Sequence, residues 1–272
     1  MLRGNSGHHS PPLGGGGGES SMTFWDHLDV LRGSLIRMLL AAVVAGVAAF
    51  CLKEWLFDFV LWPSQADFPI YRWTGIEAET LRLVNTELTE QFMIHLRVSL
   101  MMGLMVSLPY ILYVLYRFVA PGLYEHERRV GVRLVGAAYV MFMVGVAVNY
   151  LVVFPVSVQF LANYSVSSDV QNLLTITSYI DTLLMLSLVF GIVFELPVLA
   201  WLLAKAGMLR AEWMTRYRRH AVVAILIVAA VITPTGDALT LLIVSLPIWL
   251  LYEVSVWVVR STQKVKKLTM NN

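Results

Sequence analysis

The residues best placed to do chemistry are an acid and a proline inside one strongly apolar segment. The stretch GIVFELPVLAWLLAKAG, residues 191–207, holds Glu195 near its middle and Pro197 two residues later. A charge at the bilayer centre costs roughly 2.5–3.5 kcal/mol on insertion scales, so we expect Glu195 to be protonated or hydrogen-bonded in a polar, watery concavity. Pro197 predicts a bend near Val193. An interhelical hydrogen bond and a small-solute coupling site are the alternatives for Glu195.

Two other charged segments lie outside the apolar runs. The stretch YRFVAPGLYEHERRVG groups Glu125 and Glu127 with Arg128 after a Pro-Gly helix end. The stretch FWDHLDVLRGSLIR predicts an amphipathic helix that enters the membrane, with Asp29 and Arg32 on its wetter side. An ordinary solvated turn is the alternative for the first segment.

Enzyme motifs are missing from this sequence. HERRV at 126–130 lacks the second histidine of a zinc-protease helix, and no G-x-S-x-G nucleophile motif occurs. We therefore expect no catalysis, no cofactor and no metal, and we favour binding and translocation.

The composition identifies the setting of these residues. The chain has 272 residues, of which 58% are hydrophobic and 14% are charged, whereas about 25% of a soluble domain is charged. The balance predicts an all-α integral membrane protein. Residues 1–21 have a five-glycine run and predict a disordered leader or a vector-derived remnant before Met22. Residues 22–260 form one membrane domain, and 261–272 are expected to be a basic cytoplasmic tail.

Apolar runs predict six transmembrane helices. Their approximate ranges are 35–52, 92–116, 132–154, 182–204, 221–233 and 238–259. The fifth run has only 13 residues, about 20 Å of helix against a hydrocarbon core of about 30 Å. We therefore expect helices five and six to form a short hairpin that deforms the membrane beside it.

The distribution of Lys and Arg predicts the orientation. Most of them lie in the two tails and in the loops after the second and fourth runs, and the loops 155–181 and 234–238 have none. Both termini are therefore expected in the cytoplasm. The outer loop 53–91, rich in acids and tryptophan, predicts a cap with a short amphipathic helix in GIEAETLRLVNTELTEQF.

Several blocks occur in an order that resembles a known family. They are FWDHLDVLRGSL, LPYILYVLYRFVAPGLYEHERR, NYLVVFPVSVQFL, VFELPVL, ITPTGD and LPIWLLYEVSV. Together they resemble TatC, the core subunit of the twin-arginine (Sec-independent) protein translocase, over about residues 22–260. The resemblance implies a curved bundle that binds twin-arginine signal peptides and exports folded proteins across the bacterial cytoplasmic membrane with the proton-motive force.

The resemblance also implies roles for particular residues. Glu127 matches the family's signal-binding glutamate, Phe118 its upstream aromatic residue and Arg32 the arginine of its N-terminal segment. Asp29, Glu125 and Arg128 complete this expected signal-peptide site. Carboxylates suit it because they pair well with the planar guanidinium groups of two adjacent arginines.

The remaining matches divide between the membrane groove and the outer cap. Glu195 and Pro197 match the block that places a glutamate on a concave groove, and Glu253 is the weaker candidate there. Pro63, Phe92 and Asp237 match outer-loop positions, where structural support is expected.

One position departs from the family pattern. Val30 stands where the family usually has a glutamate. Asp29 points about 100° away from that position on a helix, so Glu127 has to carry more of the recognition, or signals bind more weakly.

The resemblance implies partners as well. These are TatA- and TatB-type single-span proteins, the signal peptides of folded cargo, the lipid bilayer and further copies of the chain, but no nucleic acid. The alternative function is a proton-coupled small-solute transporter with Glu195 as proton carrier.

Overall fold

The chain is helical over most of its length. The computed structural model describes residues 24–75, 78–119, 128–164, 173–233 and 237–270. The longer helices are α1 (Phe24–Phe50), α4 (Glu90–Val119), α5 (Arg128–Val148), α7 (Ile176–Val193), α8 (Leu196–Lys205), α10 (Arg218–Ile232) and α11 (Ala238–Met270). The shorter elements are α2 (Lys53–Leu61), η1 (Trp62–Ser64), α3 (Pro69–Thr74), η4 (Asn149–Val153), α6 (Phe154–Asn163) and α9 (Ala211–Arg216). The predicted leader 1–21 lies outside the described residues.

Five stretches of helix are long and apolar enough to cross a membrane. They are Asp29–Phe50, Glu90–Phe118, Arg133–Asn163, Ile176–Lys205 and Ala238–Lys264. The chain is therefore a multi-pass all-α membrane protein. The remaining predicted span, α10, has 15 residues, or about 22 Å of helix, which is short of a core of about 30 Å. Six membrane crossings remain a prediction.

The last helix differs from the prediction. α11 has 33 residues and continues to Met270, so the sixth helix is not short and the predicted basic tail is helical as far as it is described. Hydropathy marks where the membrane ends, whereas Lys, Arg and Gln are good helix formers that extend a helix into water.

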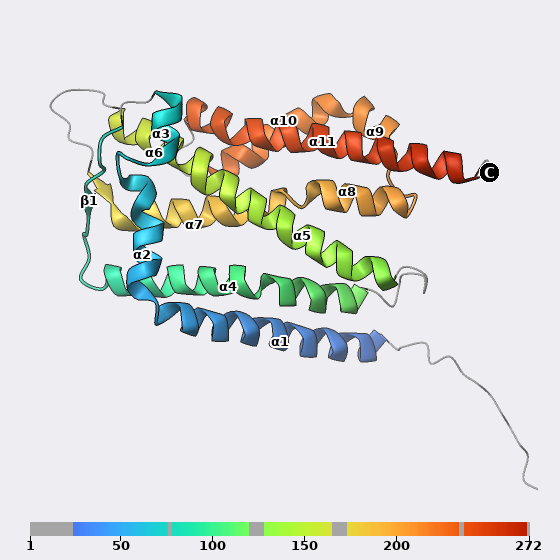
Figure 1. Ribbon diagram of the computed structural model, residues 1–272, viewed down its shortest axis with the longest axis horizontal. Helices are drawn as coiled ribbons and strands as arrows, with labels where there is room; N and C mark the ends of the chain where they lie inside the picture. Colours follow the sequence, from blue (N-terminus) through green and yellow to red (C-terminus); the bar gives the residue numbers. More distant parts are fainter. Residues whose placement is uncertain (1–23, 76–77, 120–127, 165–172, 234–236, 271–272) are drawn as a thin grey trace, which may run out of the picture.

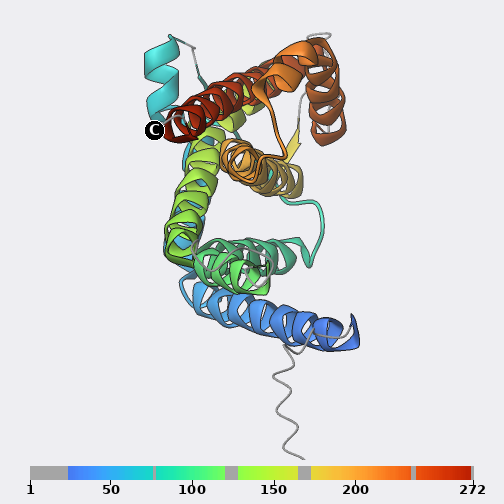
Figure 2. The ribbon, with the colours of Figure 1, turned by 90° about the vertical axis from the view of Figure 1, so that its right-hand side faces the viewer.

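The long helices form a curved wall (Figures 1 and 2). α1 lies along α4, α5 crosses obliquely, and α7 and α8 follow one another along nearly one line. Figure 2 shows that α1, α4, α5 and α11 follow an arc with α10 at its far end, and not a closed ring. The beginning of α1 and the end of α11 lie at one end of the molecule, here called the basic end; α2, α3 and β1 lie at the opposite end, the cap end (Figure 1).

A short parallel strand pair ties two outer loops together at the cap end. β1 (Leu83–Val84) pairs with β2 (Leu174–Thr175) in the register Leu83 to Leu174. The predicted helix in the outer loop is therefore wrong. Leu81 and Leu83 pack against the core while Arg82 is exposed, and this alternation has the period of a strand.

Tyrosine hydroxyl groups fasten the cap to the spans. Tyr150 and Tyr179 donate to the carbonyls of Phe59 and Val60 at 2.5 and 3.2 Å. These carbonyls lie in the last turn of α2, so the two hydroxyl groups join this helix end to η4 and α7. Within the cap, Tyr71 donates to Pro63 O at 2.6 Å. Burial raises the pKa of Tyr71 to about 12, so its hydroxyl keeps its proton and remains a donor.

The buried apolar side chains fall into two groups of unequal size. The large cluster lies between the cap and the outer halves of the spans and includes Phe68, Phe154, Ile180 and Phe190. The small cluster consists of Ala200, Ala204, Ala211 and Val259, from α8, α9 and α11 near the basic end. Most of the buried apolar packing among the described residues is therefore concentrated toward the cap end.

Candidate functional site

The helix pair α1 and α4 is held together by glycines. A Cβ atom added to Gly103 would lie 2.5 Å from Gly46 Cα and 2.7 Å from Ala42 O. Only glycine allows backbones to approach this closely, as small residues do in many membrane helix pairs. The spacing of α1 and α4 is thereby set near the middle of α4.

This helix pair brings part of the predicted signal-peptide site together at the basic end. The start of α1 and the end of α4 lie near each other there (Figure 1). Asp29 and Arg32 are exposed on α1, and Phe118 is half-buried on the last turn of α4. Glu125 and Glu127 lie outside the described residues. Arg128 is the first residue of α5, and its side chain is also outside the description.

Glu195 lies where the fourth apolar run breaks. α7 ends at Val193 and α8 begins at Leu196, and Pro197 is buried in the first turn of α8. The bend predicted from Pro197 is therefore confirmed. The Glu195 side chain is half-buried, and its Oε1 atom is buried with no hydrogen-bond partner among the described residues. A carboxyl oxygen in this condition is an open acceptor for a donor from water or another chain.

The break is packed tightly against α5 on one side. A Cβ on Gly145 would lie 2.5 Å from Phe190 O and 2.8 Å from Phe194 Cβ. One on Gly191 would lie 2.5 Å from the Phe142 ring. α5 therefore packs against the helical turns that directly precede Glu195. These contacts restrain the backbone that carries the carboxyl group.

Glu253 has a partner of its own. Its Oε2 atom lies 2.6 Å from Arg218 Nη2 at the start of α10, and Tyr252 next to it donates to Met214 O at 2.6 Å. The expected place of Glu253 in one groove with Glu195 stays a prediction. An ion pair with the neighbouring helix accounts for this acid in α11, and it joins α10 to α11.

The three expected cap residues behave differently from one another. Pro63 is buried, and its carbonyl accepts the hydrogen bond from Tyr71. Asp237 Oδ1 accepts from Thr240 N at 2.7 Å, which caps the start of α11. Phe92 is 62% exposed, and its ring meets the edge of Phe50. Pro63 and Asp237 thus make structural contacts, while Phe92 faces outward.

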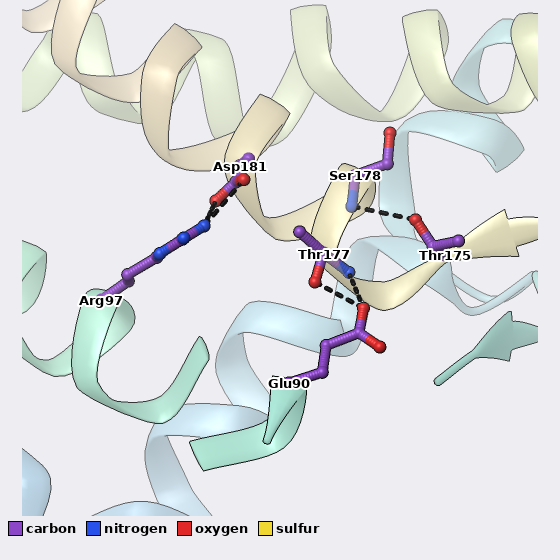
Figure 3. Close-up of polar contacts among 6 residues, drawn as sticks. All are labelled: Glu90, Arg97, Thr175, Thr177, Ser178 and Asp181. Atoms are coloured by element: carbon purple, nitrogen blue, oxygen red, sulfur yellow. Dashed lines mark hydrogen bonds and ion pairs between the residues drawn. The ribbon is translucent and has the colours of Figure 1, made fainter. Parts of the chain in front are cut away.

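A polar clasp between α4 and α7 was not predicted. Arg97 Nη1 lies 2.7 and 2.8 Å from the two oxygens of Asp181 (Figure 3). Glu90, buried at the start of α4, accepts from the backbone N–H of Thr86 and of Glu87 at 2.6 and 3.1 Å.

The same glutamate also reaches the start of α7. Its other oxygen accepts from the N–H and hydroxyl of Thr177 (Figure 3). These groups line a cavity of about 430 Å³. The clasp fixes the spacing of α4 and α7 at the cap end. The sequence could have indicated the local contact, because Glu90 lies four residues after Thr86 and near the start of a predicted helix. It could not have indicated the contact with Thr177 on α7.

The fold and these sites define a class of protein. A curved, multi-pass helical scaffold with exposed charged residues at one end, an acid at a break between two apolar helices and a fastened cap is typical of a receptor or translocation component in a membrane.

Comparison with known proteins gives the family. Residues 26–247 match the family described as "Sec-independent protein translocase protein (TatC)". The TatC protein of Carboxydothermus hydrogenoformans is 30% identical over 89% of this chain and 94% of its own length. That of Deinococcus radiodurans is 34% identical over 87% and 85%. A crystal structure of the twin-arginine translocase receptor TatC superposes with a TM-score of 0.72 at 29% identity, covering 87% of this chain and 99% of that one. The chain belongs to the TatC family.

Proposed function

We propose that this chain is the receptor and core subunit of a twin-arginine translocase, which binds signal peptides of folded cargo and exports that cargo with the proton-motive force. Its family membership supports this function over the proton-coupled transporter. On this proposal the protein carries out no chemical reaction of its own.

Recognition takes place at the basic end. Asp29 is exposed on α1, and Phe118 lies in the last turn of α4, shortly before the segment with Glu125 and Glu127. Two adjacent arginines of a signal peptide pair with Glu127 through charge-assisted hydrogen bonds, and Asp29 and Glu125 add negative charge. Phe118 provides an apolar contact for the peptide.

The remaining basic residues of the site have a different task. Arg32 and Arg128 balance the acids and keep them charged and oriented when no peptide is bound. Val30 is 42% exposed in place of the usual glutamate, so this site has fewer acids than a typical member and depends more strongly on Glu127.

The break at Glu195 is the proposed meeting place with single-span partners. Its Oε1 atom is a buried acceptor without a partner among the residues described, and a polar group from a TatA- or TatB-type helix, or water, satisfies it. Such a bond is stronger in the membrane than in water, because the local dielectric constant is low. We place both termini in the cytoplasm of a bacterium and expect several copies per receptor complex.

The observation that carries the proposal is the meeting of α1 and α4 at the basic end within a TatC-family chain. The test is binding of a fluorescent twin-arginine peptide to the purified protein in nanodiscs. We expect Glu127→Gln to weaken binding by at least about tenfold, or about 1.4 kcal/mol, and a twin-lysine peptide to bind weakly to both proteins.

The matched control is Glu212→Gln, which removes an exposed acid from α9 at the same end. It tests whether the loss reflects total charge. Equal binding by Glu127→Gln and the unaltered protein, or equal losses in Glu127→Gln and Glu212→Gln, would contradict the proposed reader.

A further inference from the structure

A separate apolar cavity lies among four helices. It has a volume of about 320 Å³ and lies between α2, α4, α5 and α7. Four methionines line it, Met101, Met102 and Met105 on α4 and Met143 on α5. This volume lies at the small end of the range for ligand pockets, about 300–1,000 Å³.

The α4, α5 and α7 residues that line the cavity belong to the apolar spans and lie toward the cap. The α4 residues that line it come 8 to 15 residues after Glu90, which corresponds to depths of about 12–22 Å along the helix. The cap closes it from above: the Phe59 and Tyr150 rings stack at 4.5 Å. Aromatic side chains of this kind lie at the membrane boundary.

Two polar groups at the cavity wall form hydrogen bonds with other groups of the protein. Ser187 lines the wall, but its Oγ accepts from Asn149 Nδ2 at 2.9 Å. Tyr150 donates its hydroxyl hydrogen to Phe59 O. The cavity therefore offers apolar contact and few donors, and water gains little by entering it.

The walls are open on one side. All four methionines are partly exposed, and Leu151 at the rim is 44% exposed. An open apolar cavity within a bilayer fills with the hydrocarbon around it, because a void would forfeit dispersion contacts on every wall. Methionine suits such an occupant because its flexible, polarizable thioether adapts to irregular shapes.

We propose that this cavity binds one acyl chain of a membrane phospholipid from the leaflet at the cap end. The lining from α5 and η4 runs from Met143 to Leu151, about 12 Å of helix, whereas a helix that crosses the membrane is about 30 Å long. A compact pocket of this length is large enough for part of one flexible acyl chain and too short for a transmembrane helix. The chain fills the space between α4 and α7 below the clasp.

The test uses photocrosslinking in nanodiscs. The probe is a phospholipid with a diazirine in the middle of one acyl chain, supplied with either a phosphatidylglycerol or a phosphatidylethanolamine headgroup. We expect adducts concentrated on the α4 peptide that contains Met101, Met102 and Met105, in equal yield for both headgroups because the tail is recognised.

Variants that fill the cavity make the test specific. Ala147→Trp adds bulk at the wall and is expected to reduce these adducts to the yield found on the exposed face of α1. The matched control is Val144→Trp, which places the same side chain at an exposed position on α5 outside the cavity and is expected to leave the adducts unchanged. Met102→Trp fills the cavity from α4 and is the second cavity-filling variant, to be used if Ala147→Trp does not fold.

Three results would overturn the proposal. The first is equal adduct yield on α4 and at exposed α1 positions such as Leu39 and Val44. The second is persistence of the α4 adducts in both cavity-filling variants. The third is a photoreactive residue at position 102 that captures a protein helix, and not lipid, in native membranes.

Discussion

Replacing Gly103 by alanine tests how the spacing of α1 and α4 supports the site. The new Cβ would lie 2.5 Å from Gly46 Cα, and ordinary van der Waals contact begins at 3.4 Å. The shortfall of 3.4 minus 2.5 Å is 0.9 Å, so α1 has to move outward by about 1 Å, because backbone atoms cannot rotate away. Overpacking of this kind costs about 1–3 kcal/mol.

A matched variant separates this cost from helix propensity. Alanine favours a helix over glycine by about 1 kcal/mol, which offsets part of the penalty in Gly103→Ala. Gly136 on α5 has no atom within 4 Å of an added Cβ, so Gly136→Ala gains the propensity without the clash. The difference between the two variants isolates the overpacking, about 1–3 kcal/mol.

The assay is thermal unfolding in one detergent, followed by tryptophan fluorescence. In a protein of this size 1 kcal/mol shifts Tm by about 2–4 °C, so Gly103→Ala is expected to unfold roughly 2–12 °C below Gly136→Ala. Because α1 carries Asp29 and α4 carries Phe118, Gly103→Ala should also weaken peptide binding. Equal Tm values for the two variants would refute the argument that this contact sets the helix spacing.

Further variants test the clasp and the helix break. Glu90→Gln removes a carboxylate that accepts five hydrogen bonds and should lower Tm, whereas the exposed control Glu87→Gln should leave Tm unchanged. Asp181→Asn should cost only about 0–1 kcal/mol, because its ion pair with Arg97 is half-exposed; a loss as large as that of Glu90→Gln would show that the pair supports more than a surface contact. Glu195→Leu should raise Tm by removing an unsatisfied oxygen and should still reduce export of a folded reporter protein, and full export with this variant would exclude a role for the carboxyl.

Local chemistry made part of this structure predictable. Pro197 has no backbone N–H to donate, so a break at the residues before it follows from covalent structure alone. The spans follow from length and hydropathy, and Asp237 at the start of a helix is a common capping residue. Each of these features depends on residues within a few positions of one another.

The remaining features depend on pairs that are far apart in sequence. Leu83 pairs with Leu174, and Arg97 pairs with Asp181 84 residues later; no local pattern indicates either partner. The apolar residues of the outer-loop segment fit the spacing of a helix as well as the alternation of a strand. The segment forms a strand because it pairs with β2. The role of Glu253 could not be predicted for the same reason, because its ion-pair partner Arg218 lies on a neighbouring helix.

The unequal sizes of the two apolar clusters have a consequence for motion. Backbone amides of α7, packed among the large cluster, should exchange their hydrogens with solvent far more slowly than those of α8 and α9, whose buried apolar residues belong to the small cluster. We therefore expect the basic end, where we propose that signal peptides bind, to open locally more readily than the cap end.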